Sequence, residues 1–294
     1  MMLITETPIG LISATPAQHS IASVQVEHSC RFDVLRVVAC LAVILLHLAA
    51  TIVRDHEFVG TLHWHVSNAI NAATSWCVPM FVMLSGALLL NPSKHKSFRD
   101  FWAKRMNRLL PALIAWSAIY FVWRTLYWHE PVSLSVIAHD VSVGQPYIHL
   151  YFLFLIAGLY LVTPFLAKAV TVFSQAQLRN LTLTIAGLAL TDRLPGLASV
   201  SAGSALTMFV PYLAYYIAGW YSGKVSLEQS PVFLWITAGA AGITTIVTAL
   251  LVSSLGIDDR RSFYFYGSFS PTVMMMAIGL FLCIMHTRIP PWLG

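Results

Sequence analysis

The sequence predicts an all-α, polytopic transmembrane helix bundle, and three observations carry that prediction: composition, recurring apolar runs and the placement of basic residues. Of the 294 residues, 57% are hydrophobic and only 10% are charged, whereas soluble domains carry about 25% charged residues. Apolar runs of about 18 or more residues recur, and each is long enough to cross a hydrocarbon core of about 30 Å. A soluble core accounts for one such run but not for a series of them.

The apolar runs predict about eight helices. We place them at about 34–53, 68–90, 108–128, 148–170, 178–195, 205–223, 232–255 and 270–286. The fifth has an irregular end, because Asp192, Arg193 and Pro195 interrupt it. Residues 1–30 are expected to form an N-terminal cytoplasmic tail, and residues 31–290 a single membrane domain. The final residues, 290–294, resemble the start of a further segment, so the sequence reads as truncated.

Basic residues predict the orientation. The densest cluster falls between the second and third predicted helices and comprises Lys94, Lys96, Arg99, Lys104, Arg105 and Arg108. The next loop, 129–146, contains no Lys or Arg. Since cytoplasmic loops are enriched in Lys and Arg, the cluster is expected inside and the loop outside. Both ends of the chain are then cytoplasmic, and the same rule explains the net charge of +5 without a nucleic-acid partner.

Cysteine and histidine spacing gives no sign of a metal site. The four cysteines, Cys30, Cys40, Cys77 and Cys283, show no paired spacing, so neither a disulfide framework nor a zinc ligand set is expected. The histidines between positions 56 and 65 fit no familiar zinc pattern.

The first predicted helix contains two ionisable residues of interest, Arg36 and His47. Eleven positions at about 100° each make nearly three turns, so both residues share one face, about 16 Å apart along the axis. An ionisable group inside a membrane is costly and usually faces a bundle interior or a wet cavity. A neutral histidine that only bonds to a neighbouring helix is the structural alternative, and Asp33 is placed to pair with Arg36.

Three further motifs follow along the chain. The second helix ends in Phe81-Val-Met-Leu-Ser85-Gly86, a small-residue pair that favours close helix packing. Arg105 and Arg108 then share one helix face before a Leu-Leu-Pro sequence, and such a pair suits either a phosphate group or lipid headgroups. The fourth helix begins with His149-Leu-Tyr151 and runs on to Pro164.

These motifs together resemble the acyltransferase family 3 of membrane O-acyltransferases. The resemblance covers residues 31–170, and within the family it is closest to bacterial enzymes that acetylate cell-surface glycans, such as the O-acetyltransferase of enterobacterial common antigen. Members usually have ten membrane helices and eight are predicted here, so the last pair is expected to be absent. Tyr151 also stands where many relatives have Trp.

The resemblance implies transfer of an acetyl group from cytoplasmic acetyl-CoA, a co-substrate, to a hydroxyl group of a glycan or glycolipid in the bacterial inner membrane, without a metal. It implies a catalytic role for His47 and Arg36, and acyl-CoA binding by Arg36, Arg105, Arg108, Ser85 and Gly86. His149 and Tyr151 would face the acceptor. Whether His47 acts as a general base or is itself acylated is left open.

Two other interpretations fit the same residues. A transporter or flippase for a lipid-linked sugar would use the intramembrane histidine and the arginines as a substrate path, but we find no internal repeat or paired helix breaks in support of it. An inactive, truncated paralogue is the other.

Overall fold

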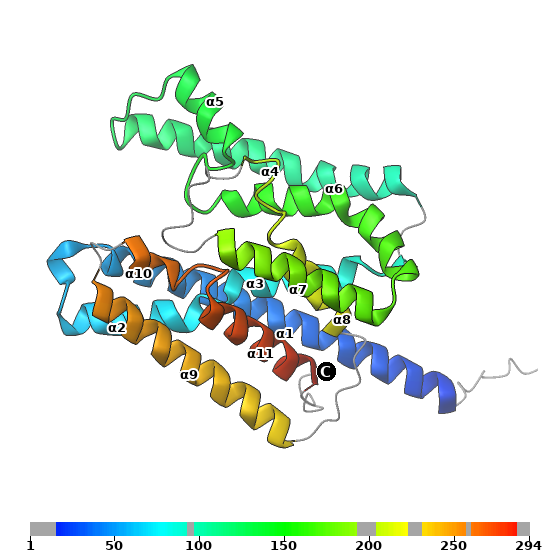
Figure 1. The fold of residues 1–294 in the computed structure, drawn as a ribbon. Coiled ribbons are helices and arrows are strands. Elements are labelled where there is room, and N and C mark those ends of the chain that lie inside the picture. The colour runs from blue at the N-terminus through cyan, green and yellow to red at the C-terminus, as the bar shows by residue number, and fades with distance from the viewer. Residues whose placement is uncertain (1–15, 93–96, 193–203, 223–230, 257–259, 287–294) are drawn as a thin grey trace, which may run out of the picture.

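The computed structural model describes residues 16–92, 97–192, 204–222, 231–256 and 260–286. These residues form helices joined by turns, and no strand occurs among them. The predicted all-α, polytopic helix bundle is confirmed (Figure 1).

The first helix is longer than its apolar run predicts. Helix α1 runs without a break from Pro16 to Val53, whereas hydropathy places its start near residue 34. The apolar part, Arg31–Val53, is the portion long and apolar enough to span a membrane. About half of the expected tail is therefore helical, because Pro is tolerated in the first turn of a helix and the following residues contain no other proline. Residues 1–15 lie outside the described residues.

The second predicted helix is two helices in line, α2 (Leu62–Thr74) and α3 (Cys77–Leu89). Thr61 caps α2, since its side chain accepts a hydrogen bond from the Trp64 amide. The break at residues 75–76 follows from Pro79, which has no N–H to donate to the Ser75 carbonyl and whose ring crowds that carbonyl. Hydropathy alone does not register this interruption, so the single helix at 68–90 was wrong.

The third and fourth predicted helices correspond to α4 (Phe98–Leu126) and α6 (Tyr151–Val172). Helix α4 begins ten residues earlier than predicted, at the cap Ser97, whose side chain accepts from the Asp100 amide. Its first turns are polar, so a search for apolar runs misses them. Between the two lies a short helix that the sequence analysis did not predict, α5 (Leu134–Ser142), capped by Ser133.

The next two predicted helices are α7 (Gln175–Asp192) and α8 (Leu213–Ser222). Helix α8 is shorter than the predicted 205–223, because Pro211 lacks an N–H and restricts the residue before it. A helix of 10 residues extends about 15 Å, which is too short to cross a bilayer.

The remaining helices are α9 (Pro231–Leu255), α10 (Arg260–Tyr264) and α11 (Pro271–His286). Helices α9 and α11 lie within two residues of the predicted boundaries. Within the described ranges, five segments are long and apolar enough to span a membrane, and Pro271–Met285 is a shorter apolar helix. Of the eight predicted spans, three fall outside this set: α7, α8 and the shorter apolar helix α11.

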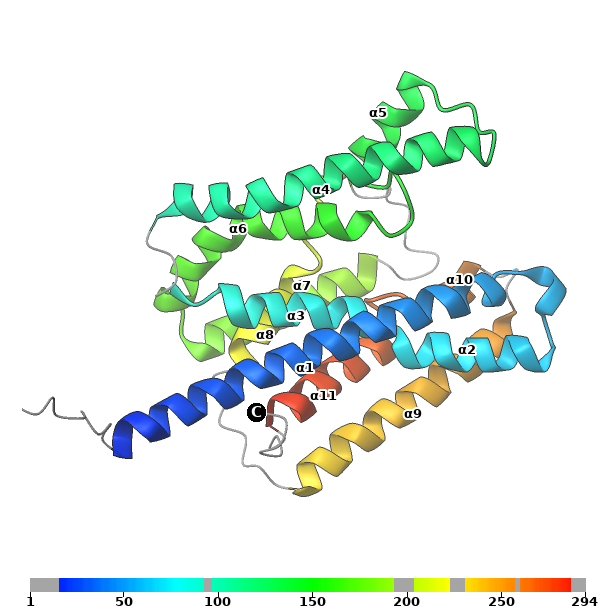
Figure 2. The same cartoon turned by 180° about the vertical axis from the view of Figure 1, so that it is seen from behind.

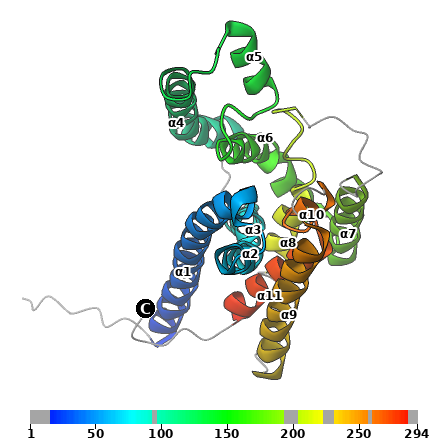
Figure 3. The same cartoon turned by 90° about the vertical axis from the view of Figure 1, so that its left-hand side faces the viewer.

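Helix α3 occupies the centre of the bundle. It contacts α1, α6, α8 and α11, while α9 packs on α2 and α11. Helices α4, α5 and α6 lie together on one side of this group, as Figures 1 and 2 show from opposite directions. Figure 3, turned by a quarter, shows the same separation. The core sits at the α3–α8 contact, where Met80, Met83 and Tyr216 are fully buried.

The outer surface is largely apolar. Large hydrophobic side chains are exposed on α1, α4 and α9, including Leu48, Ile114, Trp116, Trp235 and Ile243. A soluble protein rarely exposes so much contiguous apolar surface. These side chains are placed where lipid would cover them.

Candidate active site

Two histidines from distant parts of the chain meet at the centre of the candidate site. His47 lies on α1, two turns before that helix ends, and His149 lies in the turn just before α6. Their ring centroids are 5.1 Å apart and their planes are nearly perpendicular. Both side chains are only partly exposed. The structure thus brings together two of the predicted site residues, which are 102 positions apart in the sequence.

Aromatic residues fix the position of His149. The Tyr120 hydroxyl is 2.9 Å from His149 Nε2, and the Tyr120 ring stacks on Tyr147 with centroids 4.0 Å apart. Burial lowers the pKa of His149, so the imidazole is neutral near pH 7. The other nitrogen, Nδ1, is buried and has no hydrogen-bond partner among the described residues. A neutral histidine held this way has one ring nitrogen left to bind a substrate.

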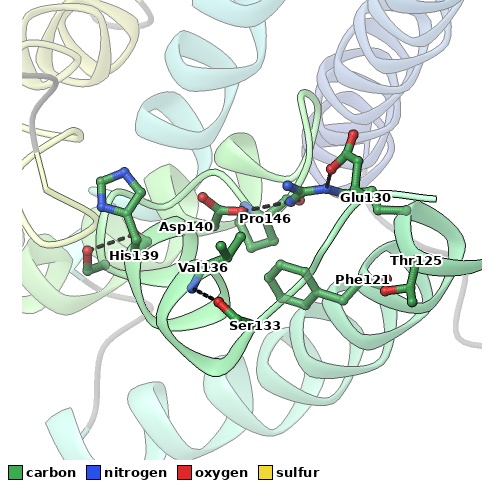
Figure 4. Close-up of polar contacts among 10 residues, drawn as sticks. Phe121, Thr125, Glu130, Ser133, Val136, His139, Asp140 and Pro146 are labelled. Carbon is green, nitrogen blue, oxygen red and sulfur yellow. Dashed lines mark hydrogen bonds and ion pairs between the residues drawn. The ribbon is translucent and has the colours of Figure 1, made fainter. Parts of the chain in front are cut away.

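An ionic clamp holds the loop that leads to His149. Arg124, near the end of α4, donates to Glu130 Oε2 and Asp140 Oδ2, each at 2.7 Å. It also donates to the Pro146 carbonyl at 3.3 Å. Figure 4 shows Glu130, Asp140 and Pro146 converging from different parts of this loop. One guanidinium therefore ties α4, α5 and the approach to α6 together.

The structure confirms the expected pairing on the first helix. Arg36 forms an ion pair with Asp33 across one turn, and the side chain of Arg36 is 47% exposed. Because α1 is continuous from Arg36 to His47, the two residues keep the helical spacing of about 16 Å.

The other two predicted phosphate-binding arginines lie on α4. The Arg105 guanidinium packs over the rings of Phe101 and Tyr160, at 5.5 and 5.7 Å from their centroids. Arg108 is exposed. Arg36 lies on α1, which does not pack closely on α4 in the described part of the chain.

Ser85 and Gly86 lie at the contact between α3 and α8. A Cβ atom built on Gly86 would be 1.9 Å from the Tyr216 carbonyl oxygen, and one built on Gly219 would be 1.9 Å from the Met83 carbonyl oxygen. The two helices therefore touch through their backbones. This is the close packing that a small-residue pair allows.

Tyr151, the other predicted acceptor-side residue, points into the protein. Its hydroxyl forms a hydrogen bond with Tyr212, which also donates to Ser268 Oγ at 3.2 Å. Tyr151 therefore links α6 to the segments before α8 and α11. Among the described residues, Tyr151 forms no hydrogen bond with His47 or His149.

The fold and the site together define a polytopic helical membrane protein with a facing pair of histidines at one end of its first spanning helix. Residues 31–293 match the model of the Acyl_transf_3 family, which is described as an acyltransferase domain. The chain therefore belongs to acyltransferase family 3, a family of membrane acyltransferases. No curated protein and no solved structure gives a match.

Sequence analysis missed three residues that support the site: Tyr120, Arg124 and Tyr147. Tyr120 and Arg124 are four positions apart and so share one face of α4, which is a visible signal in an otherwise apolar stretch. A charged residue near a helix end that faces an acidic loop is a second signal. Their partners in the loop, however, become apparent only from the fold.

The hydrogen bond to His149 predicts the effect of Tyr120→Phe. This change keeps the ring that stacks on Tyr147 but removes the hydroxyl, so we expect the rate of acyl transfer to fall about two- to tenfold. The measurement is the initial rate in membranes. Tyr127→Phe is the matched control, because Tyr127 directly follows the same helix as its C-cap residue and is 64% exposed. Equal rates for the two variants would contradict a positioning role for Tyr120.

The ionic clamp predicts a loss of stability in Arg124→Ala. Removing the guanidinium leaves two partly buried carboxylates without a partner, and we expect a cost of about 2 kcal/mol in the free energy of unfolding. Thermal unfolding in detergent measures it. Glu130→Gln should cost less, since Arg124 keeps its bond to Asp140. A larger loss in Glu130→Gln than in Arg124→Ala would contradict this account of the clamp.

Proposed function

We propose that this protein is an O-acyltransferase of the bacterial inner membrane, which moves an acetyl group from acetyl-CoA to a hydroxyl group of a cell-surface or lipid-linked glycan. The carrying observation is the contact between His47 and His149, within a chain that belongs to a family of membrane acyltransferases. The likeness of its motifs to glycan O-acetyltransferases supports the choice of acceptor.

The arginines support a nucleotide donor. Arg36 on α1 and Arg108 on α4 are exposed, and Arg105 lies one turn before Arg108 on the polar half of α4. Guanidinium groups bind phosphates in a bidentate manner. We propose that acyl-CoA binds with its phosphates near Arg36, Arg105 and Arg108, next to the α3 segment that contains Ser85 and Gly86. The pantetheine arm would then follow α1 over about 16 Å towards His47.

Two routes of acyl transfer fit the histidine pair. In the direct route, His47 takes the proton of the acceptor hydroxyl while its oxygen forms a bond to the acyl carbon. The carbon–sulfur bond then breaks, and the coenzyme A thiolate takes up a proton. In the second route, a His47 nitrogen forms the bond to the acyl carbon while the carbon–sulfur bond breaks, and coenzyme A leaves as the thiol. In a second step the hydroxyl oxygen bonds to the acyl carbon, the carbon–nitrogen bond breaks, and the freed His47 nitrogen takes up the hydroxyl proton.

His149 would serve the acceptor in both routes. Its free Nδ1 can hold a hydroxyl group close to His47, while Tyr120 keeps its other nitrogen engaged. Tyr151 lies two residues further on and would support this region through its bond to Tyr212. Neither route requires a metal.

The test is transfer of radiolabelled acetyl from acetyl-CoA into lipid-extractable glycan by membranes that contain the protein. Label in the parent membranes, lost in Arg36→Ala, would support the proposal. If the membranes consume no acetyl-CoA but move a lipid-linked sugar between leaflets, the flippase interpretation would replace this proposal. Correct insertion should be checked in each case by the accessibility of a single cysteine introduced into the loop 129–146.

A further inference from the structure

A cavity of about 220 Å³ lies between the end of α1, the last turn of α2 and the segment from the end of α10 to Gly267. Figures 1 and 2 both show these three elements side by side. Its walls include Leu46, Ala50, Arg54, Asn71, Phe263 and Tyr266. It is therefore apolar on the α1 side and polar at Arg54, Asn71 and Tyr266.

A chain of hydrogen bonds fixes which way the polar groups face. Asn68 Nδ2 donates to the Ala249 carbonyl and to Ser253 Oγ, so its Oδ1 is the atom that accepts from the Tyr266 hydroxyl. Burial raises the pKa of Tyr266 to about 12, and a hydrogen bond with the Asn71 side chain opposes that shift. Tyr266 thus stays protonated, and its hydroxyl oxygen accepts a hydrogen bond from the Asn71 amide nitrogen.

The side-chain oxygen of Asn71 accepts no hydrogen bond from this network. Asn71 is only 5% exposed, lines the cavity, and its Oδ1 has no hydrogen-bond partner in the described part of the chain. A buried acceptor without a donor destabilises the folded protein, and a ligand that supplies the donor removes that penalty. The cavity therefore presents a site for a hydroxyl or N–H donor at a defined point.

Arg54 supplies the opposite chemistry at the mouth of the same cavity. Its guanidinium lies over the Phe263 ring, 5.7 Å from the centroid, and makes no ion pair with any described residue. Arginine offers donors only. A ligand that fits both groups must carry a donor for Asn71 and an acceptor oxygen for Arg54, as neighbouring hydroxyl groups do.

The size of the cavity limits the ligand. It exceeds the volume of a single water molecule, about 30 Å³, several times over. It is smaller than the pockets of about 300 Å³ or more that hold drug-sized molecules. One six-membered sugar ring suits this space, and a whole coenzyme A does not.

The cavity is also close to the candidate catalytic histidine. Leu46 precedes His47, and Ala50 and Arg54 follow it by one and two turns on the same side of α1. Arg54 is therefore about 10 Å from His47 along the helix axis. A ring bound in the cavity would place the next part of the same glycan beside His47.

We propose that this cavity is a sugar-binding subsite for the acceptor, in which Asn71 Oδ1 accepts a hydrogen bond from one sugar hydroxyl and Arg54 donates to the oxygen of a neighbouring hydroxyl, against the Phe263 face. The proposal rests on the proposed function, since it names the part of the acceptor that the site recognises. Neither Arg54, Asn71 nor Tyr266 was singled out by the sequence motifs.

The test uses free hexoses, namely glucose, galactose and N-acetylglucosamine, as probes in two assays. In the transfer assay, at least one hexose should inhibit competitively with the glycan acceptor and not with acetyl-CoA. In thermal unfolding of the purified protein, the same hexose should stabilise the fold. Arg54→Met and Asn71→Ala should each weaken both effects about tenfold or more, and Arg54→Lys should restore part of them.

Arg179→Met on α7 is the matched control, because Arg179 is also exposed and lies away from the cavity. It should leave both effects unchanged. Sugar effects that are absent in the parent, or that survive in both cavity variants, would overturn the subsite. Because unfolding needs no turnover, a parent that shows sugar stabilisation without acetyl transfer would keep the subsite and reject the proposed function.

Discussion

His47→Ala is expected to lower acetyl transfer by about 10²–10⁴-fold, the typical contribution of a positioned acid–base group. His47 is the one histidine of the site that lies inside a membrane-spanning helix, and it contacts His149 at 5.1 Å. Without its imidazole, the acceptor hydroxyl loses its base in the direct route, and the acyl group loses its carrier in the two-step route. Initial rates at saturating acetyl-CoA measure the effect.

The control is His63→Ala, which removes an exposed histidine near the start of α2. It should keep parental activity, and both variants should insert equally well. If His47→Ala retains more than about a tenth of the rate, neither general-base nor nucleophilic catalysis by this residue survives. An acylated protein trapped in the parent and absent from His47→Ala would favour the two-step route.

Gly219→Ala is expected to abolish correct folding, although it adds a single methyl group. That Cβ would lie 1.9 Å from the Met83 carbonyl oxygen, and the obstacle is backbone that cannot rotate away. Helices α3 and α8 must therefore separate. The resulting loss in free energy of unfolding exceeds that of ordinary overpacking, which is about 1–3 kcal/mol. The bond between Tyr216 and Thr163, at 2.7 Å and fully buried, is lost with it. Yield of monodisperse protein in detergent measures the result.

Gly239→Ala provides a control of opposite sign. Gly239 lies inside α9, and a Cβ there meets nothing within 4 Å. Alanine favours a helix over glycine by about 1 kcal/mol, so this variant should be slightly more stable than the parent. Similar yields for Gly219→Ala and Gly239→Ala would show that the α3–α8 contact is looser than described.

The sequence predicts the helical class and most helix positions, because long apolar runs dominate both. It fails where a helix departs from the apolar run that contains it. Pro79 splits a continuous run, Ser97 starts a helix in polar residues, and α5 is too short for a membrane signal. The rules for helix capping and for proline predict these features, but a search for long apolar segments does not use those rules.

The candidate site was only half visible beforehand. His47 and His149 stand out as ionisable residues at helix ends, so both were named before their contact was known. Their supports, Tyr120 and Arg124, act through partners at positions 130, 140 and 149 that only the folded loop brings near. Arg54 and Asn71 were missed because the interest of each depends on the cavity between α1 and α2.

The paired glycine contacts also decide which parts of the molecule can move. A slide of α3 along α8 would press a carbonyl oxygen onto a side chain, so these helices move as one body. Helix α4 packs mainly on α6, and the His47–His149 contact lies between that pair and α1. The distance between spin labels at the exposed positions Val122 on α4 and Ile246 on α9 should show two populations. A single, unchanging distance would contradict movement of the α4–α6 pair. Rocking of the α4–α6 pair would admit a bulky acceptor. Because the same movement parts the two histidines, it would also prevent the reaction until the gap closes.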